Sequence, residues 1–375
     1  MPVGLLPALG GGIRQLAAGG QASRLINGYL KPYACAFDRV FYFSYLREAL
    51  DEFTDDSGLL TRVGVLGPGR PLGRGYRAVS MPWAHPAEFR SCRVLRVFQV
   101  TGVIPAVIVN ARFGIPYVTT YGFWYARLSQ PGPKQLLKRI VERVGLRRAA
   151  AVIATTEELR ARAATLARRV HLIPNGVDTA LFAPSELFPG GTDGRSRRVL
   201  YVGRLSAEKN LSCLVKAAAL LKSRVSVRLV VAGSGPLRET LRAEADAAGV
   251  SMEFLGIVDY RRLPEVYASA DAFVLASFTE GHPKVLLEAM STGLPCIASN
   301  CPGNRSLVIA GETGLLFDPR RPDELAACLE RVLTDRTQAV TLGKAARRLI
   351  VADYDLGALV AKEIALLKEL RGGRG

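Results

Sequence analysis

Two acidic residues, Glu280 and Glu288, stand on either side of a proline that can open a helix. Pro283 suits a first helical turn because its missing N–H would be unpaired there, and Gly293 suits the left-handed residue that ends a helix. The pattern predicts a helix that begins just after His282. Its free backbone N–H groups and the positive end of its dipole are suited to bind a phosphate. The two carboxylates that flank this site are acceptors for sugar or ribose hydroxyls.

A pair of cations, Arg204 and Lys209, lies in a second segment of the same kind. Both follow a short apolar run that ends at Gly203, and open α/β sheets bind their ligands at the carboxyl ends of such strands. The expected target of the two cations is a diphosphate. Negative charge develops on a diphosphate as it leaves, so one well-placed cation stabilises the transition state over the ground state by roughly 2–4 kcal/mol.

A third run, Val230–Leu237, has the pattern of a strand, a glycine turn and the start of a helix. Gly233 and Gly235 lack a Cβ, so the backbone of this turn could approach a nucleotide closely. We expect Arg204, Lys209 and the amino end of the predicted helix to converge on a single pyrophosphate pocket.

These segments belong to a chain that alternates short β-branched runs with amphipathic helices, which is typical of doubly wound α/β domains with parallel sheets. At 375 residues the chain exceeds the size at which one hydrophobic core stops growing, so we expect two domains with the chemistry in a cleft between them. The expected strands are Val3–Leu9, Arg39–Tyr45, Arg62–Leu66, Val94–Phe98, Pro116–Tyr121, Ala151–Ala154, His171–Ile173, Val199–Val202, Val227–Ala232, Glu253–Leu255, Ala272–Leu275, Cys296–Ala298 and Leu315–Phe317.

The run 183–198 combines Pro, Gly and charge without periodicity and predicts a linker. The expected division is therefore residues 1–182 for the first domain and 199–355 for the second. The last helical pattern, from about Leu356 to Leu370, precedes a Gly/Arg tail. Residues 356–375 could cross back to the first domain.

The composition fits a globular protein that does not cross a membrane. Hydrophobic residues make up 49% and charged residues 22% of the chain, and no segment reaches the roughly eighteen apolar residues of a membrane span. The N-terminus lacks a positive region and a long apolar core, so it predicts a first strand and a cytoplasmic protein rather than a secretory signal. The six cysteines include no C-x-x-C pair, which argues against a zinc knuckle and a disulfide framework.

Positive charge is concentrated in the first half of the chain. The net charge is +17; residues 1–180 hold 24 Lys and Arg against 11 Asp and Glu, and the remainder holds 26 against 22. The anionic partner of the first half could be nucleic acid, an anionic membrane surface or a phosphorylated substrate. Residues 133–148 predict a basic amphipathic helix, which suits either anionic lipid or packing on its own domain. Trp124 and Tyr125 could join a lipid-facing patch, a sugar platform or the core.

Five runs resemble the motifs of one enzyme family: IPNGVD (Ile173–Asp178), VGRLSAEKN (Val202–Asn210), VAGSGPL (Val231–Leu237), EGHPKVLLEAM (Glu280–Met290) and TGLLFDP (Thr313–Pro319). They occur in order and are similar to those of the GT-B fold glycosyltransferases of family 4. The resemblance covers roughly residues 173 to 354. It implies two Rossmann-like domains and a retaining, metal-independent transfer without a cofactor, from a UDP- or GDP-sugar to a glycan or lipid-linked acceptor of the cell surface.

The resemblance also implies a role for each motif residue. Arg204 and Lys209 would bind the donor diphosphate, and these two residues and Glu280, which would contact the hydroxyls of the donor sugar, would be the catalytic residues. Glu288 would bind the ribose. The other donor-binding residues would be Gly203 and Gly233 in the glycine turns, Gly256 and Val258 beside the nucleobase, Gly281, His282, Pro283, Lys284 and Val285 around the β-phosphate, and Gly20, which would close over the phosphates from the first domain.

The first domain matches the family less closely. Gly19-Gly20 lies about twenty residues before the second expected strand, which suits one helix between them, and Gly10–Gly12 is the competing choice. Many relatives carry a histidine just after the strand that here ends in Tyr121-Gly122-Phe123. This sequence has none there, so the residues on the acceptor side are not assigned.

Several other polar residues have plainer interpretations. His282 could act as a base, but its place in the nucleotide half favours shaping the loop or contacting the sugar. His85 and His171 are expected to be structural. Asp353-Tyr354-Asp355 looks like the D-x-D metal motif of the other main glycosyltransferase fold, yet we expect it to start a helix far from any strand end.

Two other functions are compatible with parts of the sequence. A sugar-nucleotide epimerase or hydrolase would keep the fold and would consume the donor with no acceptor present. A basic nucleic-acid-binding protein would need aromatic–basic clusters or a recognition helix, and neither is found. It would also leave Glu280 and Glu288 beside a groove in which acids repel phosphate.

Overall fold

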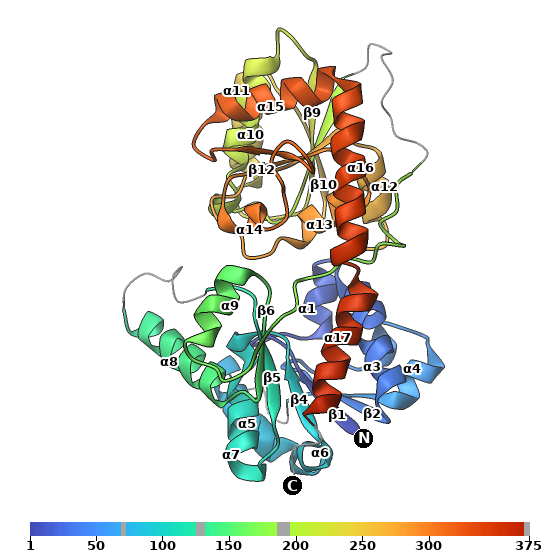
Figure 1. Ribbon diagram of the computed structural model, residues 1–375, viewed down its shortest axis with the longest axis vertical. Helices are drawn as coiled ribbons and strands as arrows, with labels where there is room; N and C mark the ends of the chain where they lie inside the picture. The colour runs from blue at the N-terminus through green and yellow to red at the C-terminus, as the bar shows by residue number, and fades with distance from the viewer. Residues whose placement is uncertain (69–72, 125–131, 186–195, 371–375) are drawn as a thin grey trace. The chain divides into compact units, whose positions relative to one another are not determined.

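The computed structural model describes residues 1–68, 73–124, 132–185 and 196–370, and it divides the chain into two compact units (Figure 1). The first unit comprises Met1–Pro174 together with Gly357–Gly375, and the second comprises Asn175–Leu356. Each unit is built around one parallel sheet. The structure thus confirms the α/β class expected from the alternating pattern.

Seven parallel strands form the described sheet of the first unit, in the order β3-β2-β1-β4-β5-β6-β7. The central strands β1 and β4 are buried along almost their whole length, as is usual for parallel strands covered on both faces. The strands are β1 (Pro2–Leu6), β2 (Arg39–Phe43), β3 (Val63–Leu66), β4 (Val94–Val97), β5 (Tyr117–Tyr121), β6 (Ala151–Ala154) and β7 (Val170–Leu172).

Crossovers between parallel strands are right-handed. The helix that connects two strands therefore covers one face of the sheet when the chain moves toward β3 and the opposite face when it moves toward β7. The steps from β1 to β2 and β3 place α1–α4 on one face, and the later steps place α5–α9 on the other. Buried residues of α5–α9 accordingly form one apolar cluster with β4 and β5. The helices are α1 (Ile13–Ala18), α2 (Ala22–Leu25), η1 (Ile26–Leu30), α3 (Lys31–Ala36), η2 (Leu50–Glu52), α4 (Ser57–Arg62), α5 (Arg74–Ala84), α6 (Pro86–Ser91), η3 (Val100–Gly102), α7 (Ile104–Phe113), α8 (Pro133–Arg148), α9 (Glu157–Ala164) and α17 (Leu356–Glu369).

A buried ion pair ties the last helix, α17, to the first unit. Arg96 Nη2 of β4 lies 2.7 Å from Glu363 Oε2 of α17, and the two side chains are 3% and 6% exposed. Arg96 also donates to Thr120 Oγ1 at 2.8 Å, and the hydroxyl of Tyr33 donates to Glu363. Burial and the nearby Glu363 charge hold the pKa of Tyr33 well above its usual range. This network joins segments that are 267 residues apart.

The second unit contains six described strands in the order β10-β9-β8-β11-β12-β13, all parallel. They are β8 (Arg197–Val202), β9 (Val227–Ala232), β10 (Ser251–Gly256), β11 (Ala272–Leu275), β12 (Cys296–Ser299) and β13 (Leu315–Phe317). The helices around them are η4 (Ala207–Lys209), α10 (Leu211–Leu221), α11 (Arg238–Ala248), α12 (Leu263–Ala268), α13 (Lys284–Ser291), α14 (Pro302–Arg305), α15 (Pro322–Thr334) and α16 (Arg336–Asp353).

Each of the thirteen expected strands has a counterpart in the structure, and their ends differ by a few residues. The first strand differs most, because it stops at Leu6 rather than continuing to Leu9. The next residue is Pro7, which has no N–H to donate to the ladder.

The two units divide earlier in the sequence than the expected boundary at residue 182. Phe182 packs against Tyr260 and Tyr267, and Val177 pairs with Asp355, so residues 175–182 belong to the second unit. Most of the predicted linker, residues 186–195, lies outside the described residues.

Within the described ranges, no helix is both long enough and apolar enough to span a membrane. The six cysteines are unpaired, and Cys92 and Cys213 are among the four that are buried. Burial raises the pKa of the Cys92 thiol to about 12 and that of Cys213 to about 11. These two thiols therefore stay protonated and pack as small apolar groups.

Replacing Glu363 by Ala should leave the Arg96 cation buried without its carboxylate. We expect the free energy of unfolding of the full chain, measured by urea denaturation, to fall by about 3–5 kcal/mol. The exposed Arg169–Glu369 pair near the end of the same helix is the control, and Glu369→Ala should change stability by less than about 1 kcal/mol. Equal effects of the two substitutions would contradict a dominant role for the buried pair.

Candidate functional site

Helix α13 forms where the proline and glycine signals predicted a helix. Pro283 is its N-cap, with φ −73° and ψ 117°, and the helical residues run from Lys284 to Ser291. Gly293 follows with φ +74°, in the left-handed region that ends helices. The prediction is confirmed with one difference: Pro283 precedes the first turn instead of lying within it. Its ring-fixed φ and extended ψ set the direction in which the chain enters the helix.

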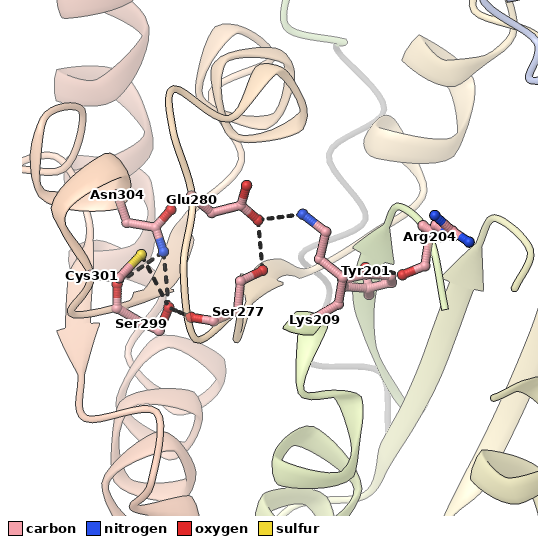
Figure 2. Close-up of polar contacts among 8 residues, drawn as sticks. All are labelled: Tyr201, Arg204, Lys209, Ser277, Glu280, Ser299, Cys301 and Asn304. Atoms are coloured by element: carbon pink, nitrogen blue, oxygen red, sulfur yellow. Dashed lines mark hydrogen bonds and ion pairs between the residues drawn. The ribbon is translucent and has the colours of Figure 1, made fainter. Parts of the chain in front are cut away.

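Lys209 and Glu280 meet in a direct ion pair (Figure 2). Lys209 Nζ lies 2.6 Å from Glu280 Oε1, and the hydroxyl of Ser277 donates to the same oxygen at 2.6 Å. The two charged side chains are 23% and 11% exposed. The pair joins η4, which follows β8, to the loop that follows β11, so a cation and a carboxylate stand at one edge of the sheet.

Asn210, which ends η4, anchors the turn that carries Lys209 to the neighbouring loops. It is the one non-glycine residue with a positive φ, +55°, in the part of the chain that the structure describes. Asparagine tolerates this conformation better than most residues. Its amide donates to Ala276 O at 3.2 Å and to Pro319 O at 2.8 Å, so the turn that carries Lys209 is anchored to the ends of β11 and β13.

A second layer of buried groups holds the Glu280 loop from behind. Ser299 donates to Ser277 O at 2.5 Å, and the Asn304 amide donates to Ser299 O at 2.9 Å (Figure 2). A Cβ added to Gly303 would lie 2.5 Å from both Glu280 O and Gly281 O. The segment after β12 therefore packs backbone against backbone on the loop that carries Glu280, which only glycine permits.

Arg204 does not join the Lys209–Glu280 pair. Its side chain is exposed, and Figure 2 shows it on the far side of Tyr201 from Glu280. The Tyr201 hydroxyl donates to Arg204 O at 2.9 Å, so the backbone of the arginine is fixed while its guanidinium extends into solvent. Of the groups expected to converge, Lys209 contacts the loop that leads into α13, and the Arg204 guanidinium does not join that contact.

Glu288 is buried rather than open to a ligand. It is 1% exposed, and one of its oxygens accepts a hydrogen bond from the Tyr267 hydroxyl at 3.0 Å. Burial and the Glu288 charge raise the pKa of Tyr267 well above its usual range. In this structure the carboxylate that was expected to bind ribose is therefore occupied within the protein.

His282 is buried, and its lowered pKa makes it a weak base. Burial and the Lys284 cation lower its pKa to about 3. Its ring lies 5.6 Å from that of Tyr354, and its carbonyl accepts from the Asn175 amide at 2.8 Å. These contacts agree with the alternative expectation that His282 shapes the loop.

The glycines of the neighbouring turns are required by packing within the protein. A Cβ on Gly233 would overlap Gly203 O, and one on Gly235 would overlap Leu205 O. Gly203 and Gly256 have φ values of +151° and +70°. Glycine at 233 and 235 thus lets two loops touch, a reason distinct from the expected approach of a nucleotide. Val258, expected beside the nucleobase, is half-buried two residues after β10.

A pocket of about 290 Å³ opens at the same edge of the sheet. Its walls come from the segments that follow β11, β12 and β13. They consist of Phe278, Asn300, Cys301, Pro302, Asp318, Pro319 and Arg320. The carboxyl ends of the parallel strands therefore provide both the ion pair and an open hollow.

Both glycine loops considered in the first unit precede helical residues. Gly20 has φ +71° and lies just before the helical run of α2, η1 and α3 that leads to β2. Gly12 precedes α1, but the backbone N–H groups of Ile13 and Arg14 already donate to Glu48 at 2.8 Å each. A carboxylate thus occupies the backbone donors beside Gly12, whereas Gly20 directly follows the end of α1.

The remaining candidate residues have structural partners. His85 Nε2 lies 2.7 Å from Gly67 O, and Asp355 accepts from Thr179 at 2.6 Å. Asp353 ends α16, and Asp355 directly precedes α17 as expected of a helix start. Among residues whose placement is described, no group of three or more His, Cys, Asp or Glu could hold a metal ion. Tyr125 lies outside the described residues, whereas Trp124 stacks on the Arg162 guanidinium.

The residues that sequence reasoning missed are those that position Glu280. The sequence could have indicated Ser277, because it stands three residues before Glu280 in the same segment. The sequence gives no indication of the other three residues, Ser299, Gly303 and Asn304, because they come from the next strand and helix.

Substituting Gly303 by Ala should force the Glu280 loop to move. We expect a loss of about 1–3 kcal/mol in the free energy of unfolding, as for other overpacked sites. Gly75 in α5 is the matched control, because a Cβ there meets nothing within 4 Å. Urea denaturation of both variants checks this, and a Gly303→Ala protein as stable as Gly75→Ala would contradict the packing.

Buried His282 should make stability depend on pH. Its pKa is about 3 when folded and about 6.5 when unfolded, so the unfolded chain binds the extra proton between these values. Its contribution should be complete above about pH 6.5 and fall as the pH drops toward 3, by at most about 1.4 kcal/mol per pH unit. Urea denaturation from about pH 7 to 4 should show a smaller loss for His282→Gln than for the wild type; parallel curves would show that His282 protonates freely when folded.

Two family models match most of this chain. The model described as Glycosyltransferase Family 4 matches residues 39–181, and the model described as Glycosyl transferases group 1 matches residues 184–349. A relative from Mycobacterium tuberculosis, GDP-mannose-dependent alpha-(1-6)-phosphatidylinositol monomannoside mannosyltransferase, is 35% identical over 211 residues. The match covers 52% of this chain and 55% of the relative, so the chain spans about half of the relative's length.

Solved structures share the fold over nearly the whole chain. Sucrose-phosphate synthase from Thermosynechococcus elongatus has a TM-score of 0.79 at 22% identity, with 99% of each chain covered. HepE of Anabaena in complex with UDP-glucose has a TM-score of 0.77 at 20% identity, with 98% of this chain and 99% of that chain covered. With its two matched models, its two parallel sheets and its motifs, the chain belongs to the GT-B glycosyltransferases of family 4.

Proposed function

We propose that this protein is a retaining glycosyltransferase that moves a sugar from a nucleotide diphosphate sugar to a glycan or lipid-linked acceptor of the cell surface. The Lys209–Glu280 pair carries the proposal, because a cation that would bind the diphosphate stands beside a carboxylate that would bind the sugar. The solved complex of HepE contains UDP-glucose, and the mycobacterial relative is named for GDP-mannose. Both names support a UDP- or GDP-sugar as the donor.

The ion pair can exchange partners when the donor binds. Lys209 would turn from Glu280 to the diphosphate and neutralise the charge that develops as the glycosidic bond breaks. Glu280, still held by the Ser277 hydroxyl, would then accept hydrogen bonds from the sugar hydroxyls. Neither charged group loses a partner in the exchange, so the step avoids the cost of an unpaired, half-buried ion.

Other groups at this edge would complete the donor site. Arg204, whose guanidinium is exposed on the same loop as Lys209, would swing onto the diphosphate. The backbone from Gly281 to Val285 would bind the β-phosphate at the start of α13. Gly256 and Val258 would lie beside the base. Glu288 would reach the ribose by giving up its bond to Tyr267. Lysine and arginine supply the positive charge in this scheme, so we propose that no metal ion or other cofactor takes part.

The basic first unit would place the acceptor at the inner face of the cell membrane, with the protein on the cytoplasmic side. Its positive charge would attract anionic lipid headgroups or a phosphorylated acceptor.

Lys209→Ala should lower kcat on the order of a hundredfold or more, because the transition-state charge loses its fixed cation. Lys216→Ala on the exposed side of α10 is the matched control and should leave the rate within about twofold. Release of nucleoside diphosphate measures both. Equal rates for the two variants would remove Lys209 from the reaction.

The metal-free scheme predicts that a chelator such as EDTA changes the rate little. Strong inhibition that is reversed by added divalent cation would contradict it.

The same assay with donor alone tests the alternative reaction, because an epimerase or hydrolase would consume UDP- or GDP-sugar with no acceptor present. Transfer that requires an acceptor supports the proposed function.

A further inference from the structure

Helix α8 exposes a stripe of aliphatic side chains. Leu136, Leu137, Ile140 and Val144 are 59%, 62%, 50% and 38% exposed. Residues three and four positions apart lie above one another on a helix, so these four form one row along α8. A surface helix normally turns such a row toward its own core. The observed exposure therefore decides against the simple expectation that this row packs on the domain.

The inward face of α8 holds different residues. Leu146 is fully buried, and a Cβ on Gly145 would lie 2.7 Å from Val103. Glu142, the one acid in the sequence of α8, is 5% exposed and accepts from the Tyr121 hydroxyl at 2.9 Å. The acid thus faces the domain.

Cations take the positions around the exposed aliphatic row. Arg139, Arg143, Arg147 and Arg148 are all exposed, whereas Glu142, the one acid of this helix, is buried. The outward side of α8 therefore combines an apolar stripe with charge of one sign.

Helix α5 adds a second exposed stripe on the same side of the sheet. Tyr76, Val79 and Trp83 are 56%, 48% and 52% exposed, at positions i, i+3 and i+7. The Arg112 guanidinium of α7 lies 5.4 Å from the Trp83 ring. Because α5, α7 and α8 cover the same face of the sheet and share one core cluster, their outward sides face the same way. We call these two stripes with their cations the α5–α8 surface.

We propose that the α5–α8 surface docks on an anionic lipid bilayer, with the aliphatic row of α8 inserted among the acyl chains near the headgroups. Charge complementarity selects this occupant: cations flanking the row attract anionic headgroups, while the aliphatic side chains and Trp83 gain from burial in the interface. A second copy of the chain would bring the same arginines against one another across a twofold contact. A nucleic acid backbone would leave the aliphatic row in contact with phosphate and water.

This surface extends the proposed function, because it supplies the membrane contact that a lipid-linked acceptor requires. Its test does not depend on transfer, since vesicle binding is measured without donor or acceptor. Failure of docking and failure of catalysis are therefore separate results.

The test is cosedimentation of the full-length protein with vesicles of phosphatidylcholine alone and of phosphatidylcholine mixed with phosphatidylglycerol. We expect binding to the mixed vesicles, weak binding to the neutral ones and loss of binding in high salt. Arg139→Gln with Arg143→Gln should weaken binding roughly thirtyfold, at about fivefold per cation. Leu137→Ser with Ile140→Ser should weaken it about tenfold or more while leaving the charge unchanged.

Matched controls come from α16 of the second unit. Lys344→Gln with Arg348→Gln repeats the loss of two exposed cations four residues apart, and Val351→Ser removes an exposed aliphatic side chain. Both should bind vesicles within about twofold of the wild type if the α5–α8 surface is the contact. Circular dichroism of each variant checks that the fold is retained.

Three results would overturn the proposal. The first is equal binding of wild type and α8 variants to the mixed vesicles. The second is wild-type protein that binds the mixed vesicles no better than the neutral vesicles. The third is a dimer in sedimentation equilibrium that Leu137→Ser with Ile140→Ser dissociates, which would assign the stripe to a second copy of the chain.

Discussion

The pairing of β8 with β11 is the constraint on which the candidate site depends. These strands are far apart in the sequence but adjacent and parallel in the sheet, with Val199 opposite Ala272. Parallel strands end at the same edge, so the segments that follow them must meet there. Lys209 leaves one strand and Glu280 the other, and their 2.6 Å contact follows from that adjacency. Without this pairing, neither residue would have the other as a partner.

The precision of the site comes from layers of loops packed without side chains between them. Gly233 lets the segment after β9 touch the Gly203 carbonyl, and Gly303 lets the segment after β12 touch the Glu280 carbonyl. Ser277 and Ser299 then close the remaining space with hydrogen bonds. Such packing leaves the carboxylate of Glu280 little freedom, which reduces the ordering that a bound sugar would require. The side chain of Arg204, in contrast, is exposed to solvent.

The first unit separates its tasks between the two faces of its sheet. One face receives α17 through the buried Arg96–Glu363 pair, which joins the last helix of the chain to β4. The other face carries α5–α9, whose outward side is basic and partly apolar at α8. The buried Arg96–Glu363 pair and the exposed aliphatic row of α8 therefore share no residues. This division would suit the proposed contact of the unit with an anionic membrane.

Residue preferences that act over a few positions were sufficient to predict the strands, helix α13 and the family of this protein. Alternating β-branched runs fixed the strands to within a few residues, because burial on both faces of a parallel sheet demands such runs. Pro283 and Gly293 located α13, since their backbone preferences act within one turn. The family motifs correctly indicated the GT-B fold and family 4.

Tertiary structure decided what depends on partners distant in sequence. The burial of Glu288 against Tyr267, the support of Glu280 by Ser299 and Gly303, and the occupation of the Ile13 amide by Glu48 all join separate elements. The helical spacing within residues 133–148 showed an apolar row but not its direction. Which side of α8 faces the core is set by how Gly145 and Leu146 fit against the sheet layer, and a periodic pattern carries no information about that fit.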